Sequence, residues 1–268
     1  MLSSLPPVRR RLLLGVVAVL LAGALVALLL AVTGRDRGGP LAGPVPQDRP
    51  GPVLLVPGYG GSTASLEVLA RRLRAAGRDA RVVPMPGGGT VDLGEQAGAL
   101  ARAAEAEIDR GAPSVDVVGY SAGGVVARLW AADDGGRALA RRVVTLGAPH
   151  HGTEVAALAG SLLPGQCPAA CRELIPDSEL LARLNRDETP DGPAWVSVWT
   201  TQDQVVTPPD SARLDGAVNI PVQGVCPDAV VGHSELPTSR LVQALVLAAL
   251  APTPPVAPAP ADCARLRS

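Results

Sequence analysis

The sequence predicts an α/β fold in which a mostly parallel sheet of about six strands is flanked by helices. Short runs of branched apolar residues alternate with longer helical patterns, which is the order that a parallel sheet requires. One passage joins a strand directly to a helix through a Gly-rich turn around Ser121. The length of 268 residues suits one domain of roughly 200 residues with further segments at its ends.

The expected strands and helices alternate between residues 53 and 250. The last expected strand contains Pro221, which lacks a backbone donor, so we place that strand at an edge of the sheet. A less regular loop precedes the short helix near residue 180. We predict strands at residues 53–56, 81–83, 115–118, 142–146, 194–200 and 218–222, and helices directly after Ser121 and at residues 66–75, 93–108, 178–184 and 239–250.

Residues 1–33 are expected to form a membrane anchor or a signal sequence. Three arginines, the last of them Arg11, precede an apolar run from Leu12 to Val32. As a helix this run would be about 31 Å long, enough to cross a bilayer as one transmembrane helix. A cleaved signal would have a shorter apolar region and a clearer cleavage site, so we favour the uncleaved anchor. The arginines before the run predict that the rest of the chain lies outside the cell membrane, or is secreted if the segment is cleaved.

Two segments rich in Gly and Pro flank the expected domain at residues 53–250. Residues 34–52 show no apolar periodicity and are predicted to be a linker between membrane and domain. Residues 251–268 form a Pro-rich tail, whose first ten residues are expected to be extended.

The four cysteines suit an oxidising compartment outside the cytoplasm. Four cysteines allow three pairings. We favour Cys167 with Cys171 and Cys226 with Cys263, because the second bridge would hold the Pro-rich tail against the domain. Free buried thiols are the alternative. The histidines lack the spacing of a zinc site, so no metal is expected.

The charge distribution argues against a nucleic-acid partner. The formal net charge is −1, and every basic side chain is Arg. Several of these arginines lie in the first 39 residues, so the remainder is mildly acidic and has no basic stripe. Nucleic-acid binding depends on such a stripe.

The turn around Ser121 has the pattern of a nucleophile elbow, Gly-x-Ser-x-Gly. Strand and helix close on either side of the serine, and side chains at Gly119 and Gly123 would collide there. The hydroxyl of Ser121 is then presented at the carboxyl end of the strand. The backbone N–H of Ala122 begins the helix, where it can stabilise a developing oxyanion. The N–H of Tyr59, in the Gly-rich loop after the first strand, is the second expected oxyanion donor.

A serine nucleophile needs an imidazole to accept its proton and a carboxylate to orient that imidazole. His233 lies in the loop after the last strand, whereas His150 and His151 are adjacent in another loop and are expected to pack there or line a pocket. Asp203 directly follows a strand and is the favoured acid, with Asp228 as the alternative. The chain order Ser, Asp, His is the order in α/β-hydrolases.

These stretches resemble the class 2 triacylglycerol lipases of bacteria, within the α/β-hydrolase superfamily. The similarity lies in residues 53–61, 119–124 and 146–153, and residues 214–219 followed by His233 are similar to the small secreted lipases of Bacillus. The resemblance covers roughly residues 53–250. It implies an α/β-hydrolase fold and hydrolysis of esters without a cofactor.

The resemblance also assigns roles to residues. Ser121, Asp203 and His233 would form the catalytic triad, and Tyr59 and Ala122 would supply the oxyanion N–H groups. Two features depart from the family pattern. Pro57 stands where such lipases usually have His, so we expect altered support of that loop. Residues 152–191 are longer than a minimal lipase needs, and we expect them to form a small cap.

The sequence therefore predicts a membrane-tethered or secreted serine esterase or lipase that acts on an ester or lipid through an acyl-enzyme on Ser121. Two alternatives remain open. The same triad would also serve acyl transfer to an alcohol or sugar of the cell envelope. A catalytically silent, membrane-anchored scaffold on the same fold is the alternative outside enzymology.

Overall fold

The computed structural model describes residues 45–267 of the chain. The predicted anchor at residues 1–33 and most of the predicted linker lie outside this range. Within residues 45–267, no helix is both long enough and apolar enough to cross a bilayer.

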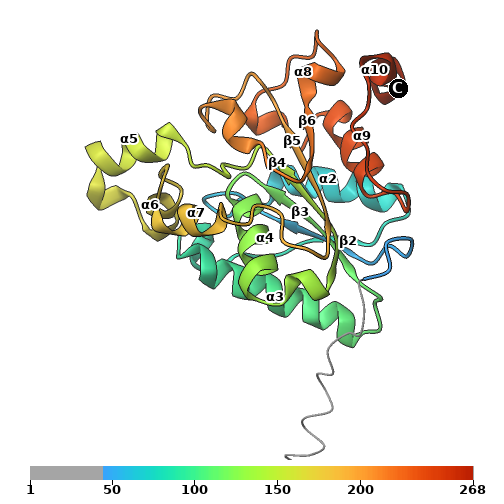
Figure 1. Cartoon of the computed structure of the whole chain (residues 1–268), viewed down its shortest axis with the longest axis horizontal. Helices are drawn as coiled ribbons and strands as arrows, with labels where there is room; N and C mark the ends of the chain where they lie inside the picture. The colour runs from blue at the N-terminus through green and yellow to red at the C-terminus, as the bar shows by residue number, and fades with distance from the viewer. Residues whose placement is uncertain (1–44, 268) are drawn as a thin grey trace, which may run out of the picture. The chain divides into compact units, whose positions relative to one another are not determined.

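Six parallel strands form one sheet at the centre of the domain (Figure 1), as the sequence predicts. Their order is β2-β1-β3-β4-β5-β6, so the strand that contains Pro221 lies at an edge. All five strand pairs are parallel. The strands are β1 (Val53–Val56), β2 (Ala80–Val82), β3 (Val115–Tyr120), β4 (Ala140–Leu146), β5 (Ala194–Trp199) and β6 (Val218–Pro221).

Helices cover both faces of the sheet because alternate side chains of each strand point to opposite faces. In β1, Val53 and Leu55 belong to one buried cluster, and Leu54 and Val56 belong to another. The first cluster contains the apolar sides of α2 (Ala64–Ala75) and α9 (Arg240–Ala249). The second contains those of α3 (Leu93–Asp109) and α4 (Ala122–Asp133). This doubly covered sheet is the predicted α/β architecture.

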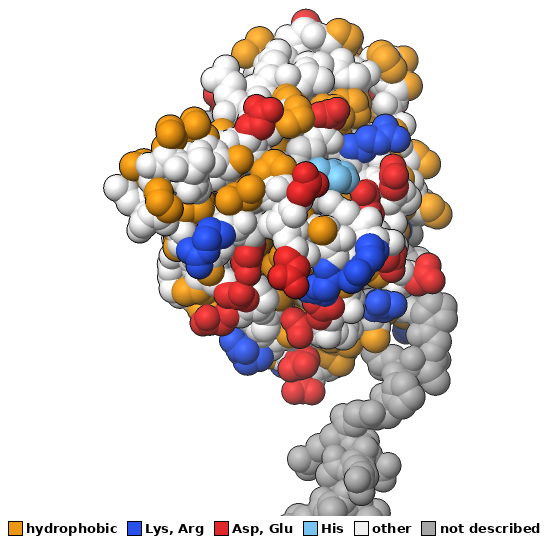
Figure 2. Space-filling model, turned by 60° about the vertical axis from the view of Figure 1, so that its left-hand side comes forward, with side chains coloured by type: hydrophobic (Ala, Val, Ile, Leu, Met, Phe, Trp, Pro, Cys, Tyr) orange, Lys and Arg blue, Asp and Glu red, His pale blue; other side chains and the backbone are white. Residues whose placement is uncertain are grey.

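The cap expected in residues 152–191 consists of three short helices between β4 and β5. These are α5 (Glu154–Leu162), α6 (Ala169–Glu173) and α7 (Glu179–Leu184), of which the sequence predicted only the last. Figure 1 shows α5 and α6 projecting from the side of the sheet. In Figure 2 hydrophobic side chains gather on this projecting part. Its exposed large hydrophobic residues are Val155, Leu158, Leu162 and Leu163.

Both favoured disulfides are present. Cys167 bonds to Cys171 before and within α6, and Cys226 bonds to Cys263. The second bridge joins the end of α8 (Val222–Val225) to α10 (Cys263–Arg267). Residues 251–259 contain neither helix nor strand, as expected for the Pro-rich tail, but α10 was not predicted.

The chain ends of the domain meet at the amino ends of the central strands. Val45 is buried, and the side chain of Gln47 accepts a hydrogen bond from Arg142. Residues 45–52 therefore pack against the domain, whereas the sequence suggested that the whole of residues 34–52 would be linker. Their lack of apolar periodicity concealed contacts that depend on backbone carbonyls, such as that of Gln47, which accepts from Arg141 at 3.1 Å.

Candidate active site

Ser121 lies in a strained turn between β3 and α4. Its φ is 53° and its ψ is −128°, a conformation that is unusual for a residue with a side chain. A Cβ atom at Gly119 would lie 2.5 Å from the carbonyl oxygen of Gly123, and one at Gly123 would lie 2.3 Å from that of Val56. Both glycines are therefore required for strand and helix to close around the serine.

His233 lies between Ser121 and Asp203. Its Nε2 is 3.0 Å from Ser121 Oγ, and its Nδ1 is 2.7 Å from Asp203 Oδ2. The other oxygen of Asp203 accepts hydrogen bonds from the N–H groups of Val205 and Val206, at 2.9 and 2.8 Å. Because the carboxylate accepts from Nδ1–H, Nε2 is left to accept from the serine hydroxyl. The three predicted residues thus meet in the geometry of a serine–histidine–acid arrangement.

Two neighbours restrict this arrangement further. The ring of Tyr120 lies 5.2 Å from that of His233, and the Tyr120 hydroxyl donates to the His233 carbonyl at 3.3 Å. Burial and, to a smaller extent, the Asp203 charge together raise the pKa of Tyr120 to about 12, so the phenol stays neutral. Gly147 lies against the His–Asp pair, since a Cβ there would be 3.3 Å from His233 Nδ1 and 2.5 Å from Leu236 Cδ1. The sequence analysis did not identify Gly147, whose place is set by the fold.

The two expected oxyanion donors flank the serine. Ala122 begins α4 directly after Ser121. The loop of Tyr59 approaches from β1, and a Cβ at Gly58 would lie 2.9 Å from that of Ser121. Within residues 45–267, no hydrogen bond uses the amide of Tyr59 or of Ala122. Both are available to a ligand at Ser121.

The other candidate residues lie apart from this arrangement. Asp228, the alternative acid, is on the surface and pairs with Arg267 at 2.8 Å. His150 is fully buried and bonds to Thr145 through Nε2 at 3.1 Å. Its burial lowers its pKa well below the ordinary value, and the charge of Arg128 adds to this effect. His150 is therefore a neutral packing residue, as expected from its position.

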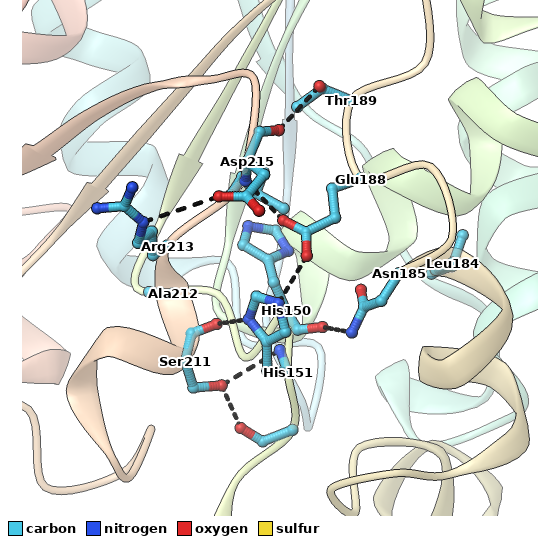
Figure 3. Close-up of polar contacts among 12 residues, drawn as sticks. His150, His151, Leu184, Asn185, Glu188, Thr189, Ser211, Ala212, Arg213 and Asp215 are labelled. Atoms are coloured by element: carbon cyan, nitrogen blue, oxygen red, sulfur yellow. Dashed lines mark hydrogen bonds and ion pairs between the residues drawn. The ribbon is translucent and has the colours of Figure 1, made fainter.

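His151 belongs to a separate surface network (Figure 3). Its Nε2 is 2.8 Å from Glu188 Oε1, and its Nδ1 is 3.2 Å from the Ser211 carbonyl. Glu188 also accepts from the N–H of Asp215 at 2.6 Å. These bonds join the loops that surround β5, and none of them involves Ser121. Among the residues that the structure describes, no group of three or more His, Cys, Asp or Glu side chains could hold a metal ion.

An apolar pocket of about 320 Å³ opens beside Ser121. It lies between the serine, the loop after β5, and helices α5 and α6. Its residues carry no charge, and most of them are apolar, which suits an uncharged apolar group attached to the atom that Ser121 would attack. It is lined by Tyr59, Ser121, Pro149, Thr153, Val155, Ala156, Ala159, Gln166, Cys171, Leu174, Val205 and Val206.

Part of the chain is similar to a known protein family. The family model described as Lipase (class 2) matches residues 110–226, a range that contains Ser121 and Asp203 but neither Tyr59 nor His233. None of the curated proteins compared with the chain matches it.

Two solved lipase structures have a similar fold. Lipase B of Aspergillus fumigatus has a TM-score of 0.68 and 19% identity, over 81% of this chain and 56% of that one. The mature lipase BlEst2 of Bacillus licheniformis has a TM-score of 0.62 and 20% identity, over 80% of this chain and 96% of that one. The chain thus spans little more than half of the Aspergillus lipase, and at these identities the likeness shows the fold alone. The family match and the shared fold agree with the resemblance of this chain to class 2 lipases.

Proposed function

We propose that the protein is a serine carboxylic-ester hydrolase, a lipase or esterase, that acts through an acyl-enzyme on Ser121. The observation that carries the proposal is the hydrogen-bonded line from Ser121 Oγ through His233 to Asp203, with distances of 3.0 and 2.7 Å. Ser121, at one end of this line, also lines the uncharged pocket.

In the first half of the reaction, Ser121 Oγ attacks the ester carbonyl while its proton passes to His233 Nε2. Asp203 stabilises the imidazolium that forms. The N–H groups of Tyr59 and Ala122 donate to the oxyanion of the tetrahedral intermediate. When this intermediate collapses, His233 protonates the leaving alcohol, and the acyl group stays on Ser121.

In the second half, water replaces the alcohol. His233 Nε2 accepts the proton of the water as its oxygen attacks the acyl carbonyl. Collapse of the second intermediate returns the proton to Ser121 and releases the carboxylic acid.

The substrate class follows from the pocket and the family match together. An uncharged, mostly apolar wall beside Ser121 favours an acyl group without charge, as in fatty acyl esters or other lipids. We further propose that the apolar run at residues 12–32 anchors the protein in the cell membrane, with the domain outside. The two disulfides agree with an oxidising compartment.

The test uses p-nitrophenyl esters with the full chain expressed under oxidising conditions. Removal of the nucleophile in Ser121→Ala should lower kcat by roughly 10⁴-fold or more, because only substrate binding and the oxyanion N–H groups remain to assist the reaction. Ser161→Ala is the matched control, because Ser161 is exposed on α5 and bonds only to the Leu158 carbonyl. A folded wild-type protein that hydrolyses no ester, but transfers an acyl group to an added alcohol, would instead indicate an acyltransferase. A protein inert in both assays would support the scaffold alternative.

A further inference from the structure

We propose that the segment from α5 to α6 selects the length of the acyl chain, with Ala156 and Ala159 of α5 as the residues that determine it. This inference rests on the proposed ester hydrolysis and concerns which esters Ser121 would accept.

One side of α5 forms part of the pocket wall. Val155, Ala156 and Ala159 all line the pocket. Positions three and four residues apart share a helix face, so Ala159 lies on the same side of α5 as Ala156 and Val155. Two of the three are alanines, and their short side chains leave the space that a longer residue would fill. The depth of the pocket therefore depends on these positions.

Another part of the wall belongs to α6 and the residues directly before and after it. Gln166, Cys171 and Leu174 line the pocket from this side. α5 also packs against the segment that follows α6, since a Cβ at Gly160 would lie 2.8 Å from Ile175 Cδ1. This contact links the two sides of the pocket wall.

The Cys167–Cys171 disulfide holds this wall in shape. It joins residues only 4 apart in sequence, against 37 for the other bridge, so it restricts the unfolded chain less. Its effect is local, because Cys171 itself lines the pocket and Arg172 donates to the Cys167 carbonyl at 2.7 Å.

Contacts with α3 fix the position of α6 on the domain. The side chain of Glu173 accepts from the N–H of Leu93 at 2.8 Å, and the N–H of Ala170 donates to the Thr90 carbonyl at 3.3 Å. The wall is thus present before any substrate binds. Such a preformed wall discriminates acyl chains by how many methylene groups fit between Ser121 and α6.

The chemistry of the pocket defines the class of acyl chain. The hydroxyl of Thr153 is occupied, since it donates to the Val205 carbonyl at 2.6 Å and accepts from the N–H of Thr207 at 3.1 Å. An unbranched, uncharged chain therefore meets mainly carbon atoms. Each methylene group that it buries should raise kcat/KM about fourfold until the pocket is full.

The main test compares Ala159→Leu with Ala157→Leu across p-nitrophenyl esters from acetate to dodecanoate. Ala157 is on the same helix, is half-buried and does not line the pocket. The added side chain at position 159 displaces about three methylene groups, so the ratio of kcat/KM for octanoate to that for acetate should fall by roughly 60-fold. Ala157→Leu should leave the ratio unchanged.

The outcomes separate the two proposals. If wild-type protein hydrolyses these esters and Ala159→Leu leaves the octanoate-to-acetate ratio unchanged, the α5–α6 segment does not select chain length. If folded wild-type protein hydrolyses none of them, the proposed function itself is wrong. Circular dichroism of each variant shows whether a loss is one of folding.

The disulfides give a second, independent test. Replacing Cys167 and Cys171 together by alanine should change the chain-length profile and lower the melting temperature only slightly. Replacing Cys226 and Cys263 together should lower the melting temperature more and leave the profile unchanged. If the chain-length profile changes in both double variants, and changes more in the one with the lower melting temperature, the Cys167–Cys171 bridge has no local role.

Discussion

The two ends of the sheet each bury a carboxylate beside a basic partner, and they use it differently. At the amino ends of the strands, Asp116 accepts from Arg141 at 2.9 and 2.7 Å and from Arg78 at 2.5 Å. At the carboxyl ends, Asp203 accepts from His233 at 2.7 Å. At the amino ends, the carboxylate of Asp116 holds two arginine side chains in place. At the carboxyl ends, His233 contacts Asp203 through one ring nitrogen and turns the other, Nε2, towards Ser121.

The remaining hydrogen bonds explain this difference. The Arg141 guanidinium also donates to the carbonyls of Gln47, Leu250 and Ala251, so it connects both ends of the domain to β4. At the other end, Ser121 keeps a positive φ, and the amides of Tyr59 and Ala122 carry no hydrogen bond within residues 45–267. Strain and unused donors destabilise a fold but prepare a site for charge that develops during a reaction. One end therefore holds the fold together, and the other contains the groups to which we assign the reaction.

The largest effect should follow from Asp203→Asn, which removes the carboxylate that pairs with His233. The amide can still accept from the N–H groups of Val205 and Val206, but it no longer stabilises a positively charged His233 or ensures the correct tautomer. We expect kcat for a p-nitrophenyl ester to fall by roughly 10⁴-fold, the size of the loss in the same substitution of a known triad. The melting temperature should change little. Asp228→Asn, on the surface pair with Arg267, is the control. A decrease of less than tenfold would exclude Asp203 as the catalytic acid.

The next effect should come from the other end of the sheet, in Asp116→Asn. This change leaves Arg141, which is fully buried, without its carboxylate. The free energy of unfolding should fall by about 3–5 kcal/mol, because an unpaired buried charge remains. Denaturation in urea measures this loss, and kcat of the folded variant should equal that of the wild type. Asp133→Asn removes a half-exposed pair with Arg183 and should cost less than about 1 kcal/mol. If both variants lose the same free energy of unfolding, burial of the ion pair does not determine its contribution to stability.

The fold was predictable because its signals are local. Runs such as Val53–Val56 are short, branched and apolar, and Pro221 identifies an edge strand by its missing donor. The small helix α5 escaped prediction because its residues are mostly Ala, Gly and Leu without a clear polar side, and α6 because it has only 5 residues. Their positions depend on contacts with distant residues, such as Glu173 with the N–H of Leu93.

The site was predictable where chemistry limits the choice. With 3 histidines in the chain and two of them adjacent, His233 was the remaining base for Ser121. Asp203 followed from its place after a strand. The pocket could not be predicted, because its walls combine segments far apart in the sequence, from Tyr59 to Val206. Gly147 also escaped, since its glycine is needed only because Leu236 and His233 pack against it in three dimensions.

The smallest predicted effect concerns Glu173, which fixes α6 near the reactive end. Burial, together with a side-chain hydrogen bond with Asp92, raises the pKa of Glu173 to about 7, although the nearby Arg172 opposes the rise. In the unfolded chain this carboxyl loses its proton near its ordinary pKa of 4.5, but in the folded protein it keeps the proton until about pH 7. The folded state thus binds more protons in this window. Stability from this group is complete below pH 4.5 and is lost as the pH rises through 7.

Glu173→Gln should remove this dependence. The amide oxygen can still accept from the N–H of Leu93, the amide N–H can donate to Asp92, and the side chain does not ionise. At pH 8 the variant should be more stable than the wild type by up to about 1 kcal/mol, a small value because solvent screens this partly exposed group. Melting temperatures between pH 4.5 and 8 measure how stability changes with pH. Glu179→Gln is the control, because Glu179 is an exposed residue of α7. A wild-type slope unchanged by Glu173→Gln would show that the Asp92–Glu173 pair holds no proton at neutral pH. If the melting temperature of the wild type falls with rising pH as expected, the contact of α6 with the domain weakens as the pH rises to neutrality. The cluster of Asp116 with Arg78 and Arg141 should show no such weakening.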